Sequence, residues 1–321
     1  MHEVEITAIA PLSSGEQSLL DLHSVLNVLN VLRCELSVLG LMVADEEEFL
    51  REGLDVCHAL VASLSDHEAG LQAARSIDAF EAVVFGELKS KVPADSPQCS
   101  AHDVLETIAN LQSVFAILKV RAREILARAA EPERWQEFDC DAVRSDFRAV
   151  FAALEKNSKG RWRILFNPAR QEPNDYYVDL RIDTDGPTLC MPPVFKDVMR
   201  DLIANARKYT APGGRITAAF YEDHDAIRFV VEDTGRGIPE SELQQVVEFG
   251  KRGSNVSDVR TMGGGFGLTK AFLVTKQFGG RFWVASEVGA GTRIRIRIPR
   301  PGDAPRRRSE TVATAGASRG H

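Results

Sequence analysis

Three motifs in the second half of the chain constrain its fold more than any other feature of the sequence. They are DLIANARKYT at 201–210, VVEDTGRGIP at 230–239 and GGGFGLTKAF at 263–272. Each is weak evidence alone, because polar helix faces, turns and flexible glycine loops are common. Their order and spacing carry the information, since a helix face, a strand end and a glycine loop can together line one binding site in an α/β domain.

The first motif combines a carboxylate, an amide and an amine. On a helix, Asp201, Asn205 and Lys208 lie at i, i+4 and i+7, so they share one face. A carboxylate and an amide oxygen one turn apart can ligate a hard cation such as Mg²⁺, directly or through water. The lysine further along can meet a phosphate. Tyr209 lies next to this face and is turned more towards the core.

The second motif ends a strand in a carboxylate. Residues alternate along AIRFVVED at 226–233, which places Asp233 on the apolar face of the predicted strand. A carboxylate there is costly without a hydrogen-bond donor, and the exocyclic amine of adenine would be such a donor. Gly235 and Gly237 lack Cβ atoms, so a ligand could approach the backbone closely.

The third motif is a glycine run that leads into a helix. Its glycines are Gly263, Gly264, Gly265 and Gly267. A loop of this kind at a helix N-terminus offers free N–H groups and the positive end of a helix dipole to phosphates. The combination of all three motifs therefore indicates a nucleotide site.

Two further segments lie near the third motif, EFGKRGSN at 248–255 and SEVGAGT at 286–292. The three motifs resemble the N, G1 and G2 boxes of the GHKL ATPase superfamily, which includes gyrase, MutL and histidine kinases. EFGKRGSN is similar to the F box of histidine kinases, and SEVGAGT is similar to their last glycine motif. The resemblance covers about 139–300 and implies an ATP-binding α/β sandwich with a mixed sheet.

This resemblance also implies roles for individual residues. Asn205 would ligate Mg²⁺, Asp233 would bind the adenine amine, and Lys208 and Tyr209 would line the phosphate and base regions. Asp201 would act in catalysis, although the family usually has Glu at this position. The other nucleotide-binding residues that it implies are Gly235, Gly237, Arg252, Gly263, Gly265, Gly267 and Thr292. Among these, Gly263, Gly265 and Gly267 would form the hinge of a mobile lid, and Arg252 would lie in that lid.

The first half of the chain is predicted to be helical. Over about 15–43, leucines and valines form two neighbouring apolar stripes, which are wider than one packed helix can cover. A bundle shared by two copies of the chain would cover both, so we expect a homodimer. Two extra helices are predicted over 46–91, with a break near Ser65, and another over about 102–130. The predicted helical domain is therefore 15–131, preceded by an N-terminal extension at 1–14.

After residue 139 the pattern changes to short strands and helices. Helices are predicted at 141–156, 193–209 and 267–278. Strands are predicted at 162–166, 176–182, 215–221, 226–233, 281–286 and 293–298. The predicted fold class is thus an N-terminal helical bundle followed by an α/β sandwich with a mixed sheet at 139–300. Residues 301–321 are rich in Pro, Arg and Ser, which predicts a disordered tail.

His23 is the candidate nucleophile in the helical half. A histidine with a pKa of about 6.5 is largely neutral at pH 7, and its lone pair can attack a phosphate. The segment HSVLNVLNVL at 23–32 places His23 and Asn27 on one polar face and is similar to the H box of histidine kinases. By that resemblance His23 is the phospho-acceptor, and Asn27 orients water for dephosphorylation. Ser24 departs from the pattern, since this position normally holds the acid that activates the imidazole.

These features predict a cytoplasmic histidine kinase. It would bind Mg·ATP, phosphorylate His23 across the dimer and pass the phosphoryl group to an aspartate on the receiver domain of a response regulator. Two alternatives remain open. Ser24 would also fit a non-catalytic or weakly active transmitter that serves as a phosphotransfer scaffold. A GHKL serine kinase would instead place acid-stable label on Ser or Thr.

Composition excludes several other classes of protein. The net charge of −7 does not suggest binding to nucleic acid. No basic segment leads into an apolar one at the N-terminus, so a signal peptide is not predicted. The most apolar run, from Val25 to Ala44, contains Arg33 and Glu35, so no transmembrane segment is expected. The five dispersed cysteines are expected to be reduced thiols.

Overall fold

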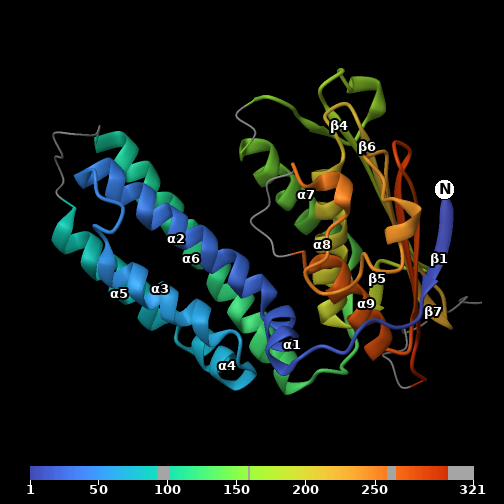
Figure 1. The fold of residues 1–321 in the computed structure, drawn as a ribbon, viewed down its shortest axis with the longest axis horizontal. Coiled ribbons are helices and arrows are strands. Elements are labelled where there is room, and N and C mark those ends of the chain that lie inside the picture. Colours follow the sequence, from blue (N-terminus) through green and yellow to red (C-terminus); the bar gives the residue numbers. More distant parts are fainter. Residues whose placement is uncertain (93–100, 158–159, 259–264, 303–321) are drawn as a thin grey trace, which may run out of the picture.

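The computed structural model describes residues 1–92, 101–157, 160–258 and 265–302. An elongated helical arm stands beside an α/β domain (Figure 1). The predicted fold class, a helical region followed by an α/β domain with a mixed sheet, is therefore confirmed. Gly263 and the part of the predicted tail from 303 onward lie outside the described residues.

The helical arm begins with a short helix and continues with longer ones. Its helices are α1 (Ser14–Asp21), α2 (His23–Ala44), α3 (Arg51–Ser63), α4 (His67–Arg75), α5 (Ile77–Lys91) and α6 (Ala101–Ala130). The helix predicted over 15–43 is broken at Leu22, whose φ of −98° and ψ of 6° lie outside the helical region. A second unpredicted break, at Ser76, divides 46–91 into three helices. His23 is consequently the first residue of α2.

Helix α2 supplies the core of the arm. Its fully buried leucines contact neighbouring helices, chiefly α3 and α6, and are Leu29, Leu32, Leu36 and Leu39. Helices of the same chain therefore cover much of the apolar surface that suggested a partner chain, while Val38 and Leu41 remain exposed. Among the described residues, α2 is also the helix long and apolar enough to cross a membrane. This is weak evidence, since core helices of bundles have the same composition.

The α/β domain is built on a mixed sheet with the strand order β1-β8-β9-β7-β6-β4-β3. Its strands are β1 (His2–Ile6), β3 (Ile164–Leu165), β4 (Tyr176–Asp183), β6 (Arg215–Glu222), β7 (Ala226–Asp233), β8 (Arg281–Glu287) and β9 (Gly291–Pro299). Strand β4 is parallel to β3 and β6, and the other neighbours are antiparallel. Two further strands, β2 (Gln136–Asp139) and β5 (Thr188–Met191), pair separately.

Strand β1 corrects the assignment of 1–14 to an extension. It pairs antiparallel with β8, so that Glu5 lies opposite Trp283, and Ile6 is fully buried in the core of the α/β domain. The strands β2 and β5 were also not predicted. The strand predicted at 162–166 is shorter, because only Ile164 and Leu165 pair with β4.

The helices of the α/β domain place one polar face towards the arm. They are α7 (Cys140–Asn157), α8 (Pro193–Tyr209) and α9 (Gly267–Gln277), with short 3₁₀ turns at Pro168–Arg170, Glu240–Glu242 and Ser254–Val256. Helix α8 packs on β6 and β7, and α9 packs on β8 and β9. Both lie between the sheet and the arm in Figure 1. Helix α8 has the predicted bounds, and Pro193 at its first turn suits a helix start.

Candidate active site

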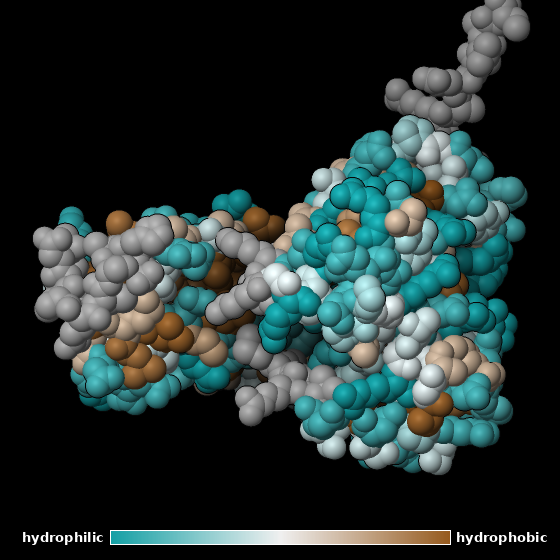
Figure 2. All heavy atoms as spheres, turned by 90° about the horizontal axis from the view of Figure 1, so that it is seen from above, coloured by the Kyte–Doolittle hydropathy of each residue, from teal (hydrophilic) through white to brown (hydrophobic). Residues whose placement is uncertain are grey.

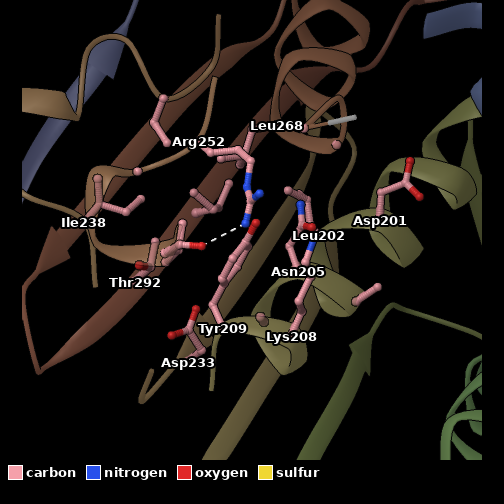
Figure 3. Close-up of a pocket in the computed structure, with 18 of the residues that line it drawn as sticks. Asp201, Leu202, Asn205, Lys208, Tyr209, Asp233, Ile238, Arg252, Leu268 and Thr292 are labelled. Atoms are coloured by element: carbon pink, nitrogen blue, oxygen red, sulfur yellow. Dashed lines mark hydrogen bonds between the residues drawn. The ribbon is translucent and has the colours of Figure 1, made fainter. Parts of the chain in front are cut away.

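A cavity of about 270 Å³ lies beside α8, the end of β7 and the start of α9, and α2 contributes to its wall (Figure 3). The predicted site residues that line it are His23, Asn27, Asp201, Asn205, Lys208, Tyr209, Asp233, Gly237, Arg252, Gly265, Gly267 and Thr292. Gly235 is not among the lining residues, and Gly263 lies outside the described part of the chain. The structure thus brings together residues from both halves of the sequence.

Asp233 ends β7 as a buried carboxylate, with 8% of the residue exposed. Its Oδ1 accepts a hydrogen bond of 2.8 Å from the backbone N–H of Gly235. Burial raises the pKa of Asp233 to about 6, although hydrogen bonds from the backbone of Gly235 and Thr292 oppose this shift. Thr292 lies directly opposite on β9 and lines the same cavity. The carboxylate therefore stands in an apolar wall where a donor on a ligand would stabilise its charge.

The two glycines after Asp233 are required by the backbone rather than by a ligand. A Cβ atom at Gly235 would lie 2.5 Å from the carbonyl oxygen of Tyr209. Gly237 has a φ of +70°, and a Cβ there would overlap the backbone of Glu287. These glycines let the turn after β7 pack tightly against α8 and β8. The expected reason for them, close approach of a ligand, applies at most to Gly237, which lines the cavity.

The polar face of α8 lines the cavity. Asn205 lies against the start of α9, where a Cβ at Gly267 would be only 2.6 Å from the Asn205 Nδ2 atom. The glycine at this position thus allows α9 to approach α8. One turn earlier on α8, Asp201 Oδ2 accepts from Lys270 Nζ at 3.3 Å. The carboxylate of Asp201 lies apart from the Asn205 amide in Figure 3.

Two cations face each other across the middle of the cavity. Lys208 Nζ lies 5.1 Å from the centroid of the Tyr209 ring. Burial and, to a smaller extent, the nearby charge of Arg252 lower the pKa of Lys208 to about 8. Arg252 donates a hydrogen bond of 2.8 Å to the carbonyl oxygen of Val256 (Figure 3). An anionic ligand between these cations would raise the pKa of Lys208 again by stabilising its charge.

His23 reaches the cavity from the first turn of α2. The residue is buried, and its Nε2 lies 3.0 Å from Asn27 Nδ2 one turn further along. Burial lowers the pKa of His23, opposed chiefly by the charge of Asp201, so the imidazole is neutral near pH 7. Among the described residues, neither His23 Nδ1 nor Ser24 Oγ has a hydrogen-bond partner. Ser24 therefore supplies nothing in place of the acid that the family pattern has there.

Two aromatic residues that the sequence did not single out hold His23 in place. The ring of Phe266 meets the His23 ring edge-on, with centroids 5.3 Å apart. On its other side, Phe266 stacks on Phe249 with centroids 4.6 Å apart. Phe266 belongs to the third motif and Phe249 to the segment at 248–255, so both residues lie in motifs that the sequence analysis had identified. Their role depends on a contact with α2 that local sequence does not reveal.

A cluster of charges behind the cavity was also missed. Asp197, one turn before Asp201 on α8, is buried and lies among basic side chains from three helices. Lys270 on α9 belongs to this cluster and also pairs with Asp201, which lines the cavity. The spacing of four residues places Asp197 on the same face of the predicted helix as Asp201, and this spacing was the sequence signal for it.

Comparison with known proteins places this site in a described family of domains. Residues 192–302 match the family described as "Histidine kinase-, DNA gyrase B-, and HSP90-like ATPase". The chain is 33% identical over 159 residues to "Adaptive-response sensory kinase SasA" of Parasynechococcus marenigrum (strain WH8102), which covers 43% of this chain and 41% of that protein. It is 36% identical over 107 residues to "Sensor protein SrrB" of Staphylococcus aureus (strain NCTC 8325), covering 32% and 18%.

Part of the chain is also similar to solved structures. One match is "Mycobacterial sensor histidine kinase MprB", with a TM-score of 0.37 and 20% identity, over 51% of this chain and 96% of that one. The chain spans about half, or less, of the length of the curated relatives it matches. The matched segment at 192–302 contains each of the motifs on which the nucleotide site was predicted.

Proposed function

We propose that this chain, whose residues 192–302 form a histidine kinase-type ATPase domain, is a protein histidine kinase that phosphorylates its own His23. A nitrogen of the imidazole attacks the γ-phosphorus of ATP, the bond from that phosphorus to the β–γ bridging oxygen breaks, and ADP leaves. The imidazole proton passes to a base or to water. The phosphoryl group then moves from His23 to an aspartate of a response-regulator receiver domain.

One observation carries this proposal. The buried imidazole of His23 lines the same cavity as Asp233 and Asn205, although α2 and the ATPase motifs are far apart in the sequence. A phosphoryl acceptor in the wall of a nucleotide cavity is positioned for transfer, and positioning is the main contribution of a protein to this reaction. The burial of His23 also keeps the imidazole neutral and therefore nucleophilic.

The cavity offers groups that suit each part of ATP. Asp233 would accept a hydrogen bond from the adenine amine, and the apolar side chains around it would contact the base. Lys208 and Arg252 would meet the phosphates. Gly265 and Gly267 would present the N-terminus of α9 to them. Each of these groups complements a negative or polar part of the nucleotide.

Magnesium fits this site through the nucleotide. Among the described residues, no group of three His, Cys, Asp or Glu side chains could hold a metal ion. Asn205 would offer its side-chain oxygen to Mg²⁺ that is already bound to the phosphates. When bound, Mg²⁺ would neutralise charge on the transferred group. Asp201 is paired with Lys270, so it would act near the metal or the nucleophile only when this ion pair opens.

Partners follow from the same proposal. The relatives named as sensory kinases support a response regulator as the phosphoryl acceptor. A homodimer through the arm is supported by exposed apolar side chains on its two longest helices, which are Val38, Leu41, Leu105, Ile117 and Val120. Figure 2 shows such apolar patches on the surface of the arm. We place the reaction in the cytoplasm, where ATP and response regulators occur.

Incubation with γ-labelled ATP tests the proposal. The wild type should acquire acid-labile label that is absent from His23→Gln, while calorimetry shows that both proteins bind the nucleotide. His58→Gln is the matched control, because His58 is an exposed residue of α3. Acid-stable label would instead favour a serine kinase. Nucleotide binding without label would favour a non-catalytic transmitter, which the absence of an acid next to His23 makes the main alternative.

A further inference from the structure

A cluster of charges around two buried residues, Asp197 and Lys270, joins the helical arm to the ATPase domain. Its members come from three helices, with Arg121, Glu124 and Arg128 on α6, Asp197, Arg200 and Asp201 on α8, and Lys270 on α9. The arginines on α6 lie seven residues apart and so share one face of that helix. The cluster therefore connects the last turns of α6 with the helix that carries the polar face of the cavity.

Asp197 is the centre of the cluster. Its side chain is 6% exposed, and the two carboxylate oxygens accept hydrogen bonds from Arg128 and Arg200. Lys270 Nζ lies 3.8 Å away and Arg121 NH1 lies 3.9 Å away. These cations hold the pKa of Asp197 well below its usual range despite burial. A buried carboxylate with several cationic partners would be left strongly destabilised if it lost them.

The rest of this junction is loosely packed. A cavity of about 410 Å³ lies on one side of the cluster and is lined by Arg128 and Lys270, among others. A second cavity, of about 220 Å³, lies on another side and is lined by Arg128, Asp197 and Arg200. Ion pairs at the centre, rather than continuous apolar packing, therefore connect α6 to α8 here. A junction of this kind can open without exposing a large apolar core.

The cluster is coupled to both ends of the phosphotransfer. Helix α6 packs along α2, so fixing the end of α6 also fixes the first turn of α2 and His23. On the other side, Lys270 pairs with Asp201 at 3.3 Å in the wall of the nucleotide cavity. A displacement of α6 relative to α8 would therefore withdraw the acceptor from the nucleotide while leaving the adenine end of the cavity intact.

We propose that the ion pair between Arg128 and Asp197 is an interdomain latch that holds the arm against the ATPase domain with His23 in the nucleotide cavity. The proposal rests on the proposed function, because it names the contact that positions the acceptor of that reaction. Arg128 and Asp197 are positioning residues. Neither residue lines the nucleotide cavity, and the charge of Asp197 is the smallest of the influences on the pKa of His23.

Kinetic measurements on the full chain test the latch. Arg128→Gln should lower the rate of His23 labelling roughly tenfold to a hundredfold, because small misplacements of a reacting group have large effects. Its affinity for Mg·ATP should remain that of the wild type. Arg128→Lys keeps a charge opposite Asp197 and should retain most of the rate. Arg134→Gln is the matched control, since Arg134 is exposed and its ion pair with Glu131 lies on the surface.

A distance measurement tests the latch independently of any kinase activity. Spin labels would be attached to Cys34 and to Val288→Cys, both exposed, in a Cys99→Ser background. We expect one narrow distance distribution for the wild type and Arg128→Lys, and a broad one for Arg128→Gln. An unchanged distance distribution in Arg128→Gln would overturn the latch. A slower phosphorylation of His23 that is fully explained by weaker nucleotide binding would overturn it as well. If the wild type acquired no phosphate label from γ-labelled ATP, the proposed function would be refuted, but the distance test of the latch would remain valid.

Discussion

The imidazole of His23 meets the ring of Phe266 edge-on, with 5.3 Å between the centroids and 84° between the planes. The first turn of α2 thereby contacts the glycine-rich segment that begins α9. Phe266 is also stacked on Phe249, so the imidazole rests against a pair of rings in the ATPase domain. The acceptor is thus held by the same segment that would present N–H groups to the phosphates.

The aromatic contact should matter for phosphoryl transfer and little for nucleotide binding. Phe266→Ala should slow His23 labelling about tenfold, because an edge-to-face aromatic pair contributes about 1 kcal/mol beyond the burial of its area. Single-turnover labelling and calorimetry would separate the two effects. Phe166→Ala is the control, since Phe166 is exposed and lies away from the cavity. Equal loss of nucleotide affinity and rate would argue against a positioning role.

Asp233 should be the main polar determinant of nucleotide binding. Asp233→Asn replaces a charged acceptor in an apolar wall, so the dissociation constant for Mg·ATP should rise roughly tenfold or more. Glu232→Gln changes the neighbouring residue, which pairs with Arg293, and should leave binding unchanged. Isothermal calorimetry on both variants is the measurement. An identical affinity in Asp233→Asn would remove the basis of the nucleotide site.

The stability of the nucleotide-free protein should carry the signature of Asp233. The pKa of this carboxyl is about 6 in the folded protein and 3.8 in an ordinary environment, so the folded state binds the proton more tightly. The stabilising contribution is fully present below pH 4 and is lost as the pH rises through 6. The free energy of unfolding of the wild type should therefore fall by about 2 kcal/mol relative to Asp233→Asn between pH 4 and 7. Urea titrations across this range would show no such difference if the carboxyl were solvated.

We expect Ser24 to limit the rate of His23 phosphorylation, because it offers no general base to the imidazole. Ser24→Glu places a carboxylate beside the His23 imidazole, whose Nδ1 has no partner among the described residues. General-base assistance should then raise the labelling rate roughly tenfold or more. Ser24→Gln has nearly the same shape without the charge and is the control. A similar rate in both variants would show that the missing acid is not what limits the reaction.

Phosphoryl transfer should occur within one chain. Transfer across a dimer was expected from the sequence, but His23 lines the cavity of its own chain. A mixture of His23→Gln, which binds ATP, and Asp233→Asn, which retains the acceptor, should therefore show no more label than Asp233→Asn alone at the same low ATP concentration. Additional label on the Asp233→Asn chain in the mixture, resolved by a size tag, would show transfer between chains.

The sequence was most informative where a residue that starts or ends a helix stands next to a regularly spaced polar face. Helix α8 has its predicted bounds because Pro193 marks its start and a polar face is spaced at the helical period. The break at Leu22 carries no glycine or proline, so the strongly apolar pattern around it predicted one continuous helix. Strand β1 was missed because it is short and its partner, β8, lies at the other end of the chain.

The site followed the same division. Asn205 and Asp233 were recognisable from motifs that each lie within one element, and they do line one cavity. The roles of Phe266, Asp197 and Lys270 depend on how α2 and α6 pack against the ATPase domain. Such contacts join residues distant in sequence, and no local pattern specifies them.

Because of strand β1, both ends of the helical arm are connected to the ATPase domain. The chain leaves the seven-stranded sheet after Ile6 and forms every helix of the arm. It then re-enters the ATPase domain at β2, which pairs with β5. The arm is consequently tethered at two points, which restricts it to swinging about the line that joins them rather than turning freely. A fusion that disturbs the first strand would remove one of these two connections. The arm could then adopt a much wider range of orientations relative to the ATPase domain.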